Sequence, residues 1–354
     1  MTIALAPLGI LYGAVARTRL RLYRSGFLKT ENVGVPVISV GNITTGGTGK
    51  TPLVECVARA VALEGRRACV LTRGYGRADE RRRVVVSDGE RVLADAGESG
   101  DEPRLLAEQL LGVAAVVCDR DRVGAARWAR ETLGAEVFIL DDGFQHMKIA
   151  RDLDIVTLDA TAPWGGGHML PRGRLREPRE GLRRADCIII TRSEQASDLK
   201  GLRAEVARLA GSRSLVIASR VRTRGLRLLG GAYEMIEGAN AELESVAKGQ
   251  SAAAFCGVGN PRAFFEQLRR EGFDLRYTRA FPDHHDFRDS DLAAVVREAE
   301  QGGARILLTT AKDAVKLRGR SFPLPCYVVE IGLEFEDEEA LLGLVREAIQ
   351  YRER

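Results

Sequence analysis

From residue 36 onward, short apolar runs alternate with longer segments in which apolar and polar residues mix at helical spacing. The apolar runs are nearly continuous, which is typical of strands that helices cover on both faces. A first set occupies residues 36–40, 68–72, 114–118, 136–140, 154–158, 186–191 and 215–219. A second set occupies residues 252–258, 275–281, 305–310 and 326–331. The pattern predicts two α/β/α domains with mostly parallel sheets.

Residues 221–250 separate the two sets and resemble neither. They include two adjacent glycines, Gly230 and Gly231, and an acidic run. We interpret this stretch as a hinge. The expected organisation is an N-terminal segment (residues 1–35), a first domain (36–221), a linker (222–250) and a smaller α/β domain (251–354).

The N-terminal segment is apolar at first and basic afterwards. Residues 1–16 carry no charge, but they are too few to span a bilayer comfortably, and a secretory signal would place its positive charges before the apolar stretch. On a helical wheel, apolar side chains share one face and three arginines lie opposite: Leu8, Leu11, Tyr12, Val15 and Leu22 against Arg17, Arg21 and Arg24. The segment fits a helix lying on an anionic membrane surface, and equally a helix packed on its own domain.

The charge of the chain supports a local role for its basic residues. The 354 residues include 53 Lys or Arg and 49 Asp or Glu, for a formal net charge of +4. Residues 1–35 hold five basic residues and one acid, so the rest of the chain holds 48 of each. A nucleic-acid partner is therefore not expected, because such binding usually needs basic charge over a whole domain.

Residues 41–51 follow a predicted strand and precede a helical pattern that begins near Pro52. Glycines at this point let consecutive backbone N–H groups curl around a phosphate, at the positive end of the next helix. The strict phosphate-loop pattern has Gly at position 44, whereas this chain has Thr44; the alternative is a glycine-rich turn with a chance Lys-Thr pair. The residues expected to bind nucleotide are Thr44, Thr45, Gly46, Gly47, Thr48, Gly49, Lys50 and Thr51.

A second strand end carries adjacent carboxylates. Residues 136–140 lead directly into Asp141 and Asp142, as in the strand that holds Mg²⁺ beside a phosphate loop. The two acids could also form an ordinary strand-end turn with Gly143, but the neighbouring phosphate loop favours a metal role. Gln145 and His146 follow and would project near the same edge.

Four further loops combine charge with Gly or Pro: residues 72–77, 100–103, 170–178 and 281–286. Each alone could be a solvated turn. Together with the phosphate loop and residues 138–146 (FILDDGFQH), they resemble the tetraacyldisaccharide 4′-kinase family of the lipid A pathway of Gram-negative bacteria. FILDDGFQH and LPRGRLREP (residues 170–178) are the specific motifs. The departure from the strict phosphate-loop pattern at Thr44 also resembles this family. The resemblance covers nearly the whole chain.

The resemblance implies transfer of the ATP γ-phosphoryl group, with Mg²⁺, to the 4′-hydroxyl of a tetraacylated glucosamine disaccharide 1-phosphate. It implies a first domain with a phosphate-loop NTPase fold, peripheral attachment to the anionic cytoplasmic face of the inner membrane, and no obligate protein partner. It also makes Asp101 the base that accepts the sugar proton and His284 its partner, although His285 is adjacent. The second domain would then have to close over ATP to bring His284 to Asp101.

Further roles follow from the motifs themselves together with the resemblance, and for the arginines of residues 168–184 the alternative is a solvated basic loop. Lys50 would neutralise charge on the transferring phosphoryl group. Residues 309–313 would lie beside the nucleotide base, although a helix cap would look the same. The candidate metal ligands are Thr51, Asp141, Asp142, Gln145 and Glu177. The candidate substrate contacts are Arg73, Tyr75, His146, Arg172, Arg174 and Arg176, the last three for the 1-phosphate.

Three other functions are weighed against this one. The first is a phosphate-loop kinase that acts on another sugar or lipid; a soluble substrate would not need the apolar face of the first helix. A nucleotide switch or metallochaperone GTPase would need a guanine-reading Asn-Lys-x-Asp motif, which does not occur, or metal-ligand cysteines. The six cysteines are scattered, which favours buried thiols in a reducing compartment. A membrane-bound binding protein would leave the paired acids unexplained.

Overall fold

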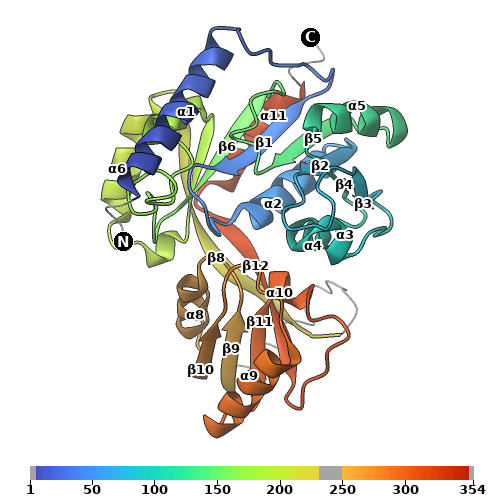
Figure 1. Cartoon of the computed structure of the whole chain (residues 1–354), viewed down its shortest axis with the longest axis vertical. Coiled ribbons are helices and arrows are strands. Elements are labelled where there is room, and N and C mark those ends of the chain that lie inside the picture. Colours follow the sequence, from blue (N-terminus) through green and yellow to red (C-terminus); the bar gives the residue numbers. More distant parts are fainter. Residues whose placement is uncertain (1–4, 231–248, 351–354) are drawn as a thin grey trace.

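The computed structural model describes residues 5–230 and 249–350 and has two lobes joined by a pair of long strands (Figure 1). The strands follow one order, β10-β9-β11-β12-β8-β7-β6-β1-β5-β2-β4-β3. Only β12–β8 and β3–β4 are antiparallel pairs among those described. The α/β prediction with a mostly parallel sheet is confirmed. The strands are β1 (Val37–Asn42), β2 (Ala68–Thr72), β3 (Val84–Ser87), β4 (Ala114–Cys118), β5 (Val137–Asp141), β6 (Leu153–Asp159), β7 (Cys187–Thr191), β8 (Leu215–Leu228), β9 (Ser251–Cys256), β10 (Asp274–Ala280), β11 (Ile306–Thr310) and β12 (Cys326–Phe335).

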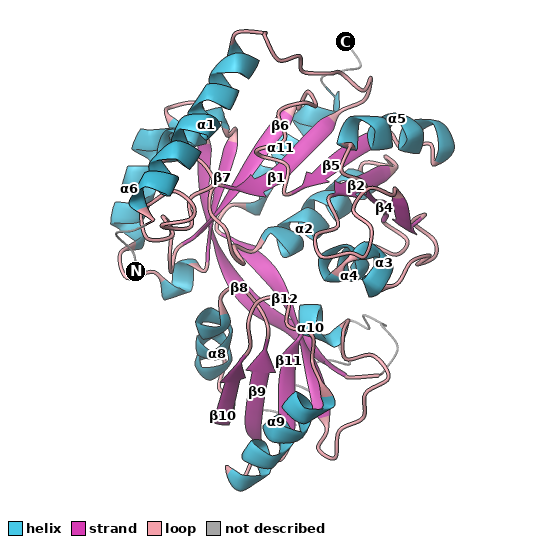
Figure 2. Cartoon of the chain, in the orientation of Figure 1, coloured by secondary structure: helices cyan, strands magenta, loops and turns pink. Residues whose placement is uncertain are grey.

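Helices cover the sheet on both faces (Figure 2). They are α1 (Ala6–Arg24), α2 (Lys50–Leu63), α3 (Ala96–Ser99), α4 (Asp101–Gln109), α5 (Arg122–Thr132), α6 (Leu199–Ala210), α8 (Pro261–Arg270), α9 (Asp289–Gln301), α10 (Ala311–Ala314) and α11 (Glu338–Gln350), with 3₁₀ turns η1 (Arg179–Arg184) and η2 (Ser193–Gln195). Successive residues of β1 enter different cores: Ile38 packs with α2, and Val37 packs with α5. Burial on both faces explains why the strands read as continuous apolar runs.

The connection between the lobes differs from the expected linker. Residues 222–228 belong to β8, which pairs with β12 from Ser219 to Leu228. In the stretch Arg220–Arg224, charged and less polar residues alternate. This is the period of a strand with one exposed face, which explains why these residues extend β8 instead of forming a linker. Residues 231–248, the rest of the expected linker, lie outside the described residues. The division into two domains stays a prediction.

Two further elements depart from the sequence expectation. The short strand β3 was not expected, because it directly follows a run of arginines, Arg81–Arg83, which is typical of a solvated loop. Helix α11 falls in the segment assigned to the second domain, residues 251–354. It packs instead on α2, β1 and β6 of the first lobe, where Leu341 and Val345 join the core.

Helix α1 contacts the first lobe through its glycines. Gly9 and Gly13 are buried and lie close to Met169, because the missing side chains allow a close approach. Apolar residues on other sides of the helix are left exposed: Ile10 is 73% exposed, Leu11 61% and Val15 60%. Among residues 5–230 and 249–350, no helix is both long and apolar enough to cross a bilayer.

Candidate active site

Buried hydrogen bonds fix the conformation of the phosphate loop. It connects β1 to α2, and Gly49 at its end adopts the left-handed region with φ of 83°. The Asn42 side-chain amide donates to Thr48 Oγ1 at 2.9 Å, and the Thr191 hydroxyl donates to the Thr48 carbonyl at 2.9 Å. Thr48 Oγ1 also lies 2.7 Å from Thr157 Oγ1. These buried contacts tie the loop to three strands, so its conformation is set before any ligand arrives.

The loop also pairs with the LPRGRLREP segment. Thr45 N donates to the Arg174 carbonyl at 2.8 Å, and Arg176 N donates to the Ile43 carbonyl at 2.8 Å. Two motifs separated by more than a hundred residues therefore form one surface. Thr44 is buried beneath it.

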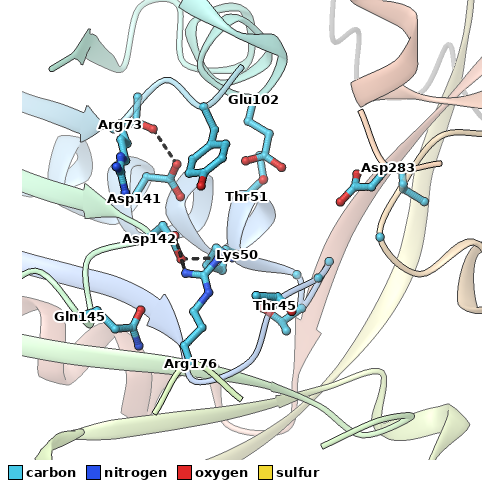
Figure 3. A pocket seen from close by; sticks show the side chains of 18 of the residues that line it. Thr45, Lys50, Thr51, Arg73, Glu102, Asp141, Asp142, Gln145, Arg176 and Asp283 are labelled. Atoms are coloured by element: carbon cyan, nitrogen blue, oxygen red, sulfur yellow. Dashed lines mark hydrogen bonds and ion pairs between the residues drawn. The ribbon is translucent and has the colours of Figure 1, made fainter. Parts of the chain in front are cut away.

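Asp142 lies between two cations (Figure 3). Lys50 Nζ is 3.4 Å from Asp142 Oδ1, and Arg176 Nη1 is 2.6 Å from Asp142 Oδ2. Burial opposes ionisation of this carboxyl, but the charges of Lys50 and Arg176 outweigh it and hold its pKa well below the usual range. Asp142 has a φ of 52°.

Its neighbour Asp141 has the opposite electrostatic environment. Burial and the nearby carboxylates of Glu102 and Asp142 raise the pKa of Asp141 to about 6. The Thr72 hydroxyl donates to Asp141 Oδ2 at 3.0 Å. A buried carboxylate this close to two others is a group that a bound cation would stabilise.

The donors at this edge suit a hard cation. Thr51, Asp141 and Asp142 offer hydroxyl and carboxylate oxygens beside the phosphate loop. No cluster of three or more His, Cys, Asp or Glu suited to a metal occurs within residues 5–230 and 249–350. Mg²⁺ needs none, because it is usually bound by one or two carboxylates together with substrate phosphates and water. The residues present therefore fit Mg²⁺.

Gln145 and Glu177, the other expected metal ligands, contact each other. Gln145 Nε2 donates to Glu177 Oε1 at 2.6 Å and to the Asn42 carbonyl at 2.8 Å. Glu177 Oε2 also pairs with Arg184 at 2.7 Å. Both side chains line the same cavity as Asp141. Whether they bind metal stays a prediction.

Asp101 and His284 meet across the two lobes. Asp101 begins α4, His284 lies in the loop after β10 with φ of 61°, and His284 Nδ1 is 3.2 Å from Asp101 Oδ2. His285 instead contacts Asp291 at 2.9 Å. Burial opposes ionisation of Asp101, but hydrogen bonds from His284 and Lys316 lower its pKa.

A cavity of about 980 Å³ runs between the phosphate loop, helix α1 and the second lobe. Most predicted site residues line it: Thr45, Gly46, Gly47, Thr48, Gly49, Lys50, Thr51, Arg73, Tyr75, Asp141, Asp142, Gln145, His146, Arg176, Glu177 and His284. Burial, together with nearby cations led by Arg122, lowers the pKa of His146 to about 3, so its imidazole is neutral. The Arg73 guanidinium lies 5.4 Å from the centre of the Tyr75 ring.

Four predicted residues do not line this cavity: Thr44, Asp101, Arg172 and Arg174. Asp101 contacts His284, which does line the cavity. Arg172 lies beside Gly9 of α1, and Arg174 donates to the Gly259 carbonyl of the second lobe at 3.2 Å. The three arginines expected to act together are therefore separated. In an extended segment they would share one face, but this segment turns back on itself, with Gly173 N donating to the Met169 carbonyl at 3.0 Å.

Comparison with known proteins identifies the family. A sequence model of the LpxK family, described as tetraacyldisaccharide-1-P 4′-kinase, matches residues 1–350. The chain belongs to this family. It is 45% identical over 322 residues to the tetraacyldisaccharide 4′-kinase of Anaeromyxobacter sp. (strain Fw109-5), covering 89% of this chain and 83% of that one. It is 42% identical over 313 residues to that of Geobacter metallireducens, covering 88% of each.

A solved structure agrees with this family assignment. The fold is similar to that of LpxK from Aquifex aeolicus in complex with ATP, with a TM-score of 0.76 and 31% identity over 98% of this chain and 99% of that one. The expected family and enzyme class, a tetraacyldisaccharide 4′-kinase, are confirmed, as is the expected phosphate-loop NTPase fold.

Several side chains at the site of this kinase family member were not singled out from the sequence. Arg122 is buried and donates to the Asp141 carbonyl at 2.8 Å, and nothing in its helical segment signals that role. Arg192 donates to the Gly47 carbonyl at 2.9 Å. It follows the carboxyl end of β7, where α/β sheets place their ligands, so this position could have been found. Lys316 contacts Asp101 in the first turn of α4. It lies four residues after Lys312 of the segment 309–313, in which Thr310, Ala311 and Lys312 line the cavity; a place beside the nucleotide base stays a prediction for that segment.

Proposed function

We propose that this chain transfers the γ-phosphoryl group of ATP to the 4′-hydroxyl of a tetraacylated glucosamine disaccharide 1-phosphate, the lipid A precursor, to give the 1,4′-bisphosphate. One observation carries the proposal. A single cavity joins the phosphate loop, the His284 that contacts Asp101, and residues Tyr12 and Val15 of α1. Family membership supplies the substrate, since the relatives bear the name tetraacyldisaccharide 4′-kinase.

The chain's own residues would act as follows. The loop from Thr45 to Thr51 binds the nucleotide phosphates through its backbone N–H groups, and Lys50 contributes positive charge near the β- and γ-phosphates. The sugar oxygen attacks the γ-phosphorus while the bond to the β–γ bridging oxygen breaks, which releases ADP. Asp101 accepts the proton of the sugar hydroxyl, and His284 orients Asp101.

We assign Mg²⁺ to Thr51, Asp141 and Asp142, with Gln145 and Glu177 beside them. When bound, the ion supplies charge neutralisation at the phosphates. We assign the sugar and its 1-phosphate to the basic and aromatic side chains of the cavity wall, Arg73, Tyr75, His146 and Arg176. Arg172 and Arg174 are proposed as contacts at its margin, near α1 and the phosphate loop.

Attachment to the membrane is the second part of the proposal. The exposed apolar side chains of α1 would insert between lipids at the cytoplasmic face of the inner membrane, and Arg17, Arg21 and Arg24 would face anionic headgroups. Because α1 also lines the cavity, an acylated substrate could enter without leaving the membrane surface. The two-domain division and closure of the second domain over ATP belong to this proposal. The contact of His284 with Asp101 does not itself require further closure, since Nδ1 and Oδ2 already lie 3.2 Å apart.

The test is a transfer assay with radiolabelled ATP and the disaccharide 1-phosphate in detergent micelles. The wild type is expected to label the lipid, while Lys50→Ala and Asp101→Ala lose most of this activity. Equal transfer by Lys50→Ala and the wild type would contradict the phosphate-loop mechanism. ATP hydrolysis without labelling of any lipid would instead favour a nucleotide switch.

A further inference from the structure

Two lysines of the second lobe contact the Asp101–His284 pair and its surroundings. Lys312 lies on α10, and Lys316 follows it by four residues. Lys312 Nζ is 3.0 Å from Glu102 Oε1, 3.0 Å from Asp283 Oδ1 and 3.2 Å from His284 Nε2. Lys316 Nζ is 2.7 Å from Asp101 Oδ2 and donates to the His285 carbonyl at 3.0 Å. Their side chains are 14% and 11% exposed.

The contact of Lys312 determines the tautomer of His284. An ammonium group has only donors, so His284 Nε2 must be the acceptor in this contact. The single proton of the neutral imidazole is then on Nδ1, which donates to Asp101 Oδ2. Burial opposes the charge of Lys312, but Glu102 and Asp283 outweigh it and raise the pKa of the ammonium group.

The contact of Lys316 acts on Asp101 itself. Lys316 and His284 both approach Oδ2, so this oxygen is occupied by two donors. Their hydrogen bonds favour the ionised carboxylate, which explains its lowered pKa against the effect of burial. Oδ1 is then the oxygen we assign to accept the proton.

We propose that Lys312 and Lys316 are positioning residues that fix the protonation state of the base, Lys312 by holding His284 as a donor and Lys316 by holding Asp101 ionised. The inference rests on the proposed role of Asp101 as the base. It also excludes His284 as the proton acceptor, since its free nitrogen faces an ammonium group. The charged and titratable groups packed around the pair are Glu102 from α4, Asp283 and His285 from the loop after β10, and Lys312 and Lys316.

The first test is the pH profile of kcat for lipid phosphorylation. In Lys316→Met the pKa of Asp101 rises, so activity is lost at low pH and regained at high pH. The acid limb is expected to move up by about one to three pH units, the usual effect of one close opposite charge. Lys316→Arg should restore the limb. Lys148→Met, which removes a lysine paired with Asp121 and Glu31 on the surface, should leave the profile unchanged.

The second test follows the tautomer by ¹⁵N NMR of the histidine side chains. The chain has four histidines, and His284→Gln identifies the signals of His284. In the wild type, His284 should carry its proton on Nδ1. In Lys312→Met, the population with the proton on Nε2 should rise, because no ammonium group then donates a hydrogen bond to that nitrogen.

A third variant separates positioning from contact between the lobes. Asn260 of the second lobe donates to Asp159 Oδ2 and Thr161 Oγ1 of the first, both at 3.0 Å. Asn260→Ala should change KM for ATP without moving the acid limb. The inference is overturned if Lys316→Met keeps the wild-type limb, if Lys312→Met keeps the wild-type tautomer, or if both lysine variants change only KM for ATP. Full transfer by Asp101→Asn would instead overturn the assignment of the base.

Discussion

Asp142 and Arg176 form an ion pair in which one guanidinium nitrogen, Nη1, lies 2.7 Å from Oδ1 and 2.6 Å from Oδ2. Asp142 follows β5, and Arg176 belongs to the LPRGRLREP segment. Asp142 also pairs with Lys50 of the phosphate loop, and the LPRGRLREP segment is hydrogen-bonded to that loop. The position of Lys50, the lysine proposed to act on the phosphates, is therefore linked to a motif far from it in the sequence.

Loss of this pair should weaken use of Mg²⁺. Arg176→Met removes the closer of the two cations and frees Asp142 to pair more tightly with Lys50. This pairing draws Asp142 away from the proposed Mg²⁺ site and Lys50 away from the nucleotide phosphates. We expect kcat/KM to fall by about 10- to 100-fold at limiting Mg²⁺, the usual effect of losing a partner of a metal ligand. Titration of activity with Mg²⁺ measures this. Arg183→Met, at an exposed position of the same basic stretch, is the matched control and should behave as the wild type.

The second lobe touches the phosphate loop at Gly259, where a side chain would not fit. A Cβ there would lie 2.7 Å from Gly47 N and 3.1 Å from Gly46 Cα. Gly259→Ala should therefore push the loops apart and raise KM for ATP by about tenfold, the equivalent of about 1.4 kcal/mol. Steady-state kinetics at varied ATP measures it.

Gly343→Ala provides the control for that substitution. Gly343 lies in α11, and a Cβ there meets no atom within 4 Å. Alanine should leave KM unchanged and stabilise the helix by up to about 1 kcal/mol. An unchanged KM for ATP in Gly259→Ala would show that the lobes need not approach this closely during turnover.

The exposed face of α1 can be tested apart from the cavity. Ile10 and Leu11 are exposed and do not line it, so Ile10→Glu with Leu11→Glu alters only the surface proposed to face the membrane. Because each apolar side chain contributes about 1.5–3 kcal/mol when fully buried, binding to vesicles containing anionic lipid should fall more than tenfold. Cosedimentation measures binding. Leu93→Glu, exposed elsewhere, should not change it, and retained binding by the double variant would refute membrane insertion through this face.

Stability should depend on pH through Asp154. This carboxyl is buried, its Oδ2 lies 3.3 Å from Arg151 Nη2, and burial raises its pKa to about 6 despite that arginine. Since the folded state binds a proton more tightly than the unfolded state, this contribution to stability is full below about pH 4 and is lost as pH rises through 6. The change amounts to about 3 kcal/mol. Urea unfolding of Asp154→Asn should lack this part of the pH dependence.

Asp88 supplies a control of opposite sign. Backbone N–H groups of Arg91 and Glu90 lower its pKa, so its contribution is present at neutral pH and is lost as pH falls. Asp88→Asn should therefore flatten the acid side of the stability curve. If Asp154→Asn kept the full wild-type dependence between pH 4 and 6, the raised pKa of Asp154 would be wrong.

Local patterns predicted much of the site because the phosphate loop is continuous in sequence. Residues 41–51 carry their own evidence: glycines, Lys50, Thr51 and the flanking strand and helix. Asp141 could be placed beside them because parallel strands end at one edge of the sheet. The contact of Asp101 with His284 spans 183 residues, and only the resemblance to a known family supplied it.

Other features were beyond local reasoning because tertiary contacts decide them. Arg172, Arg174 and Arg176 form one basic run in the sequence, but only Arg176 lines the cavity. The contacts of Lys312 and Lys316 with α4 depend on how the lobes meet, which no spacing within either lobe encodes. The extension of β8 beyond Ser219 was missed because its arginines suggested a solvated linker.

Helix α11 has a consequence for synthesis of the chain on the ribosome. The strands of the first lobe emerge early, yet the helix that covers α2 and β6 is nearly the last part to be made. At about 5–20 residues per second, the apolar surface of α2 that α11 covers stays exposed for on the order of ten seconds while the second lobe is translated. A chain released early would expose that surface permanently, so incomplete products should be prone to aggregation and degradation.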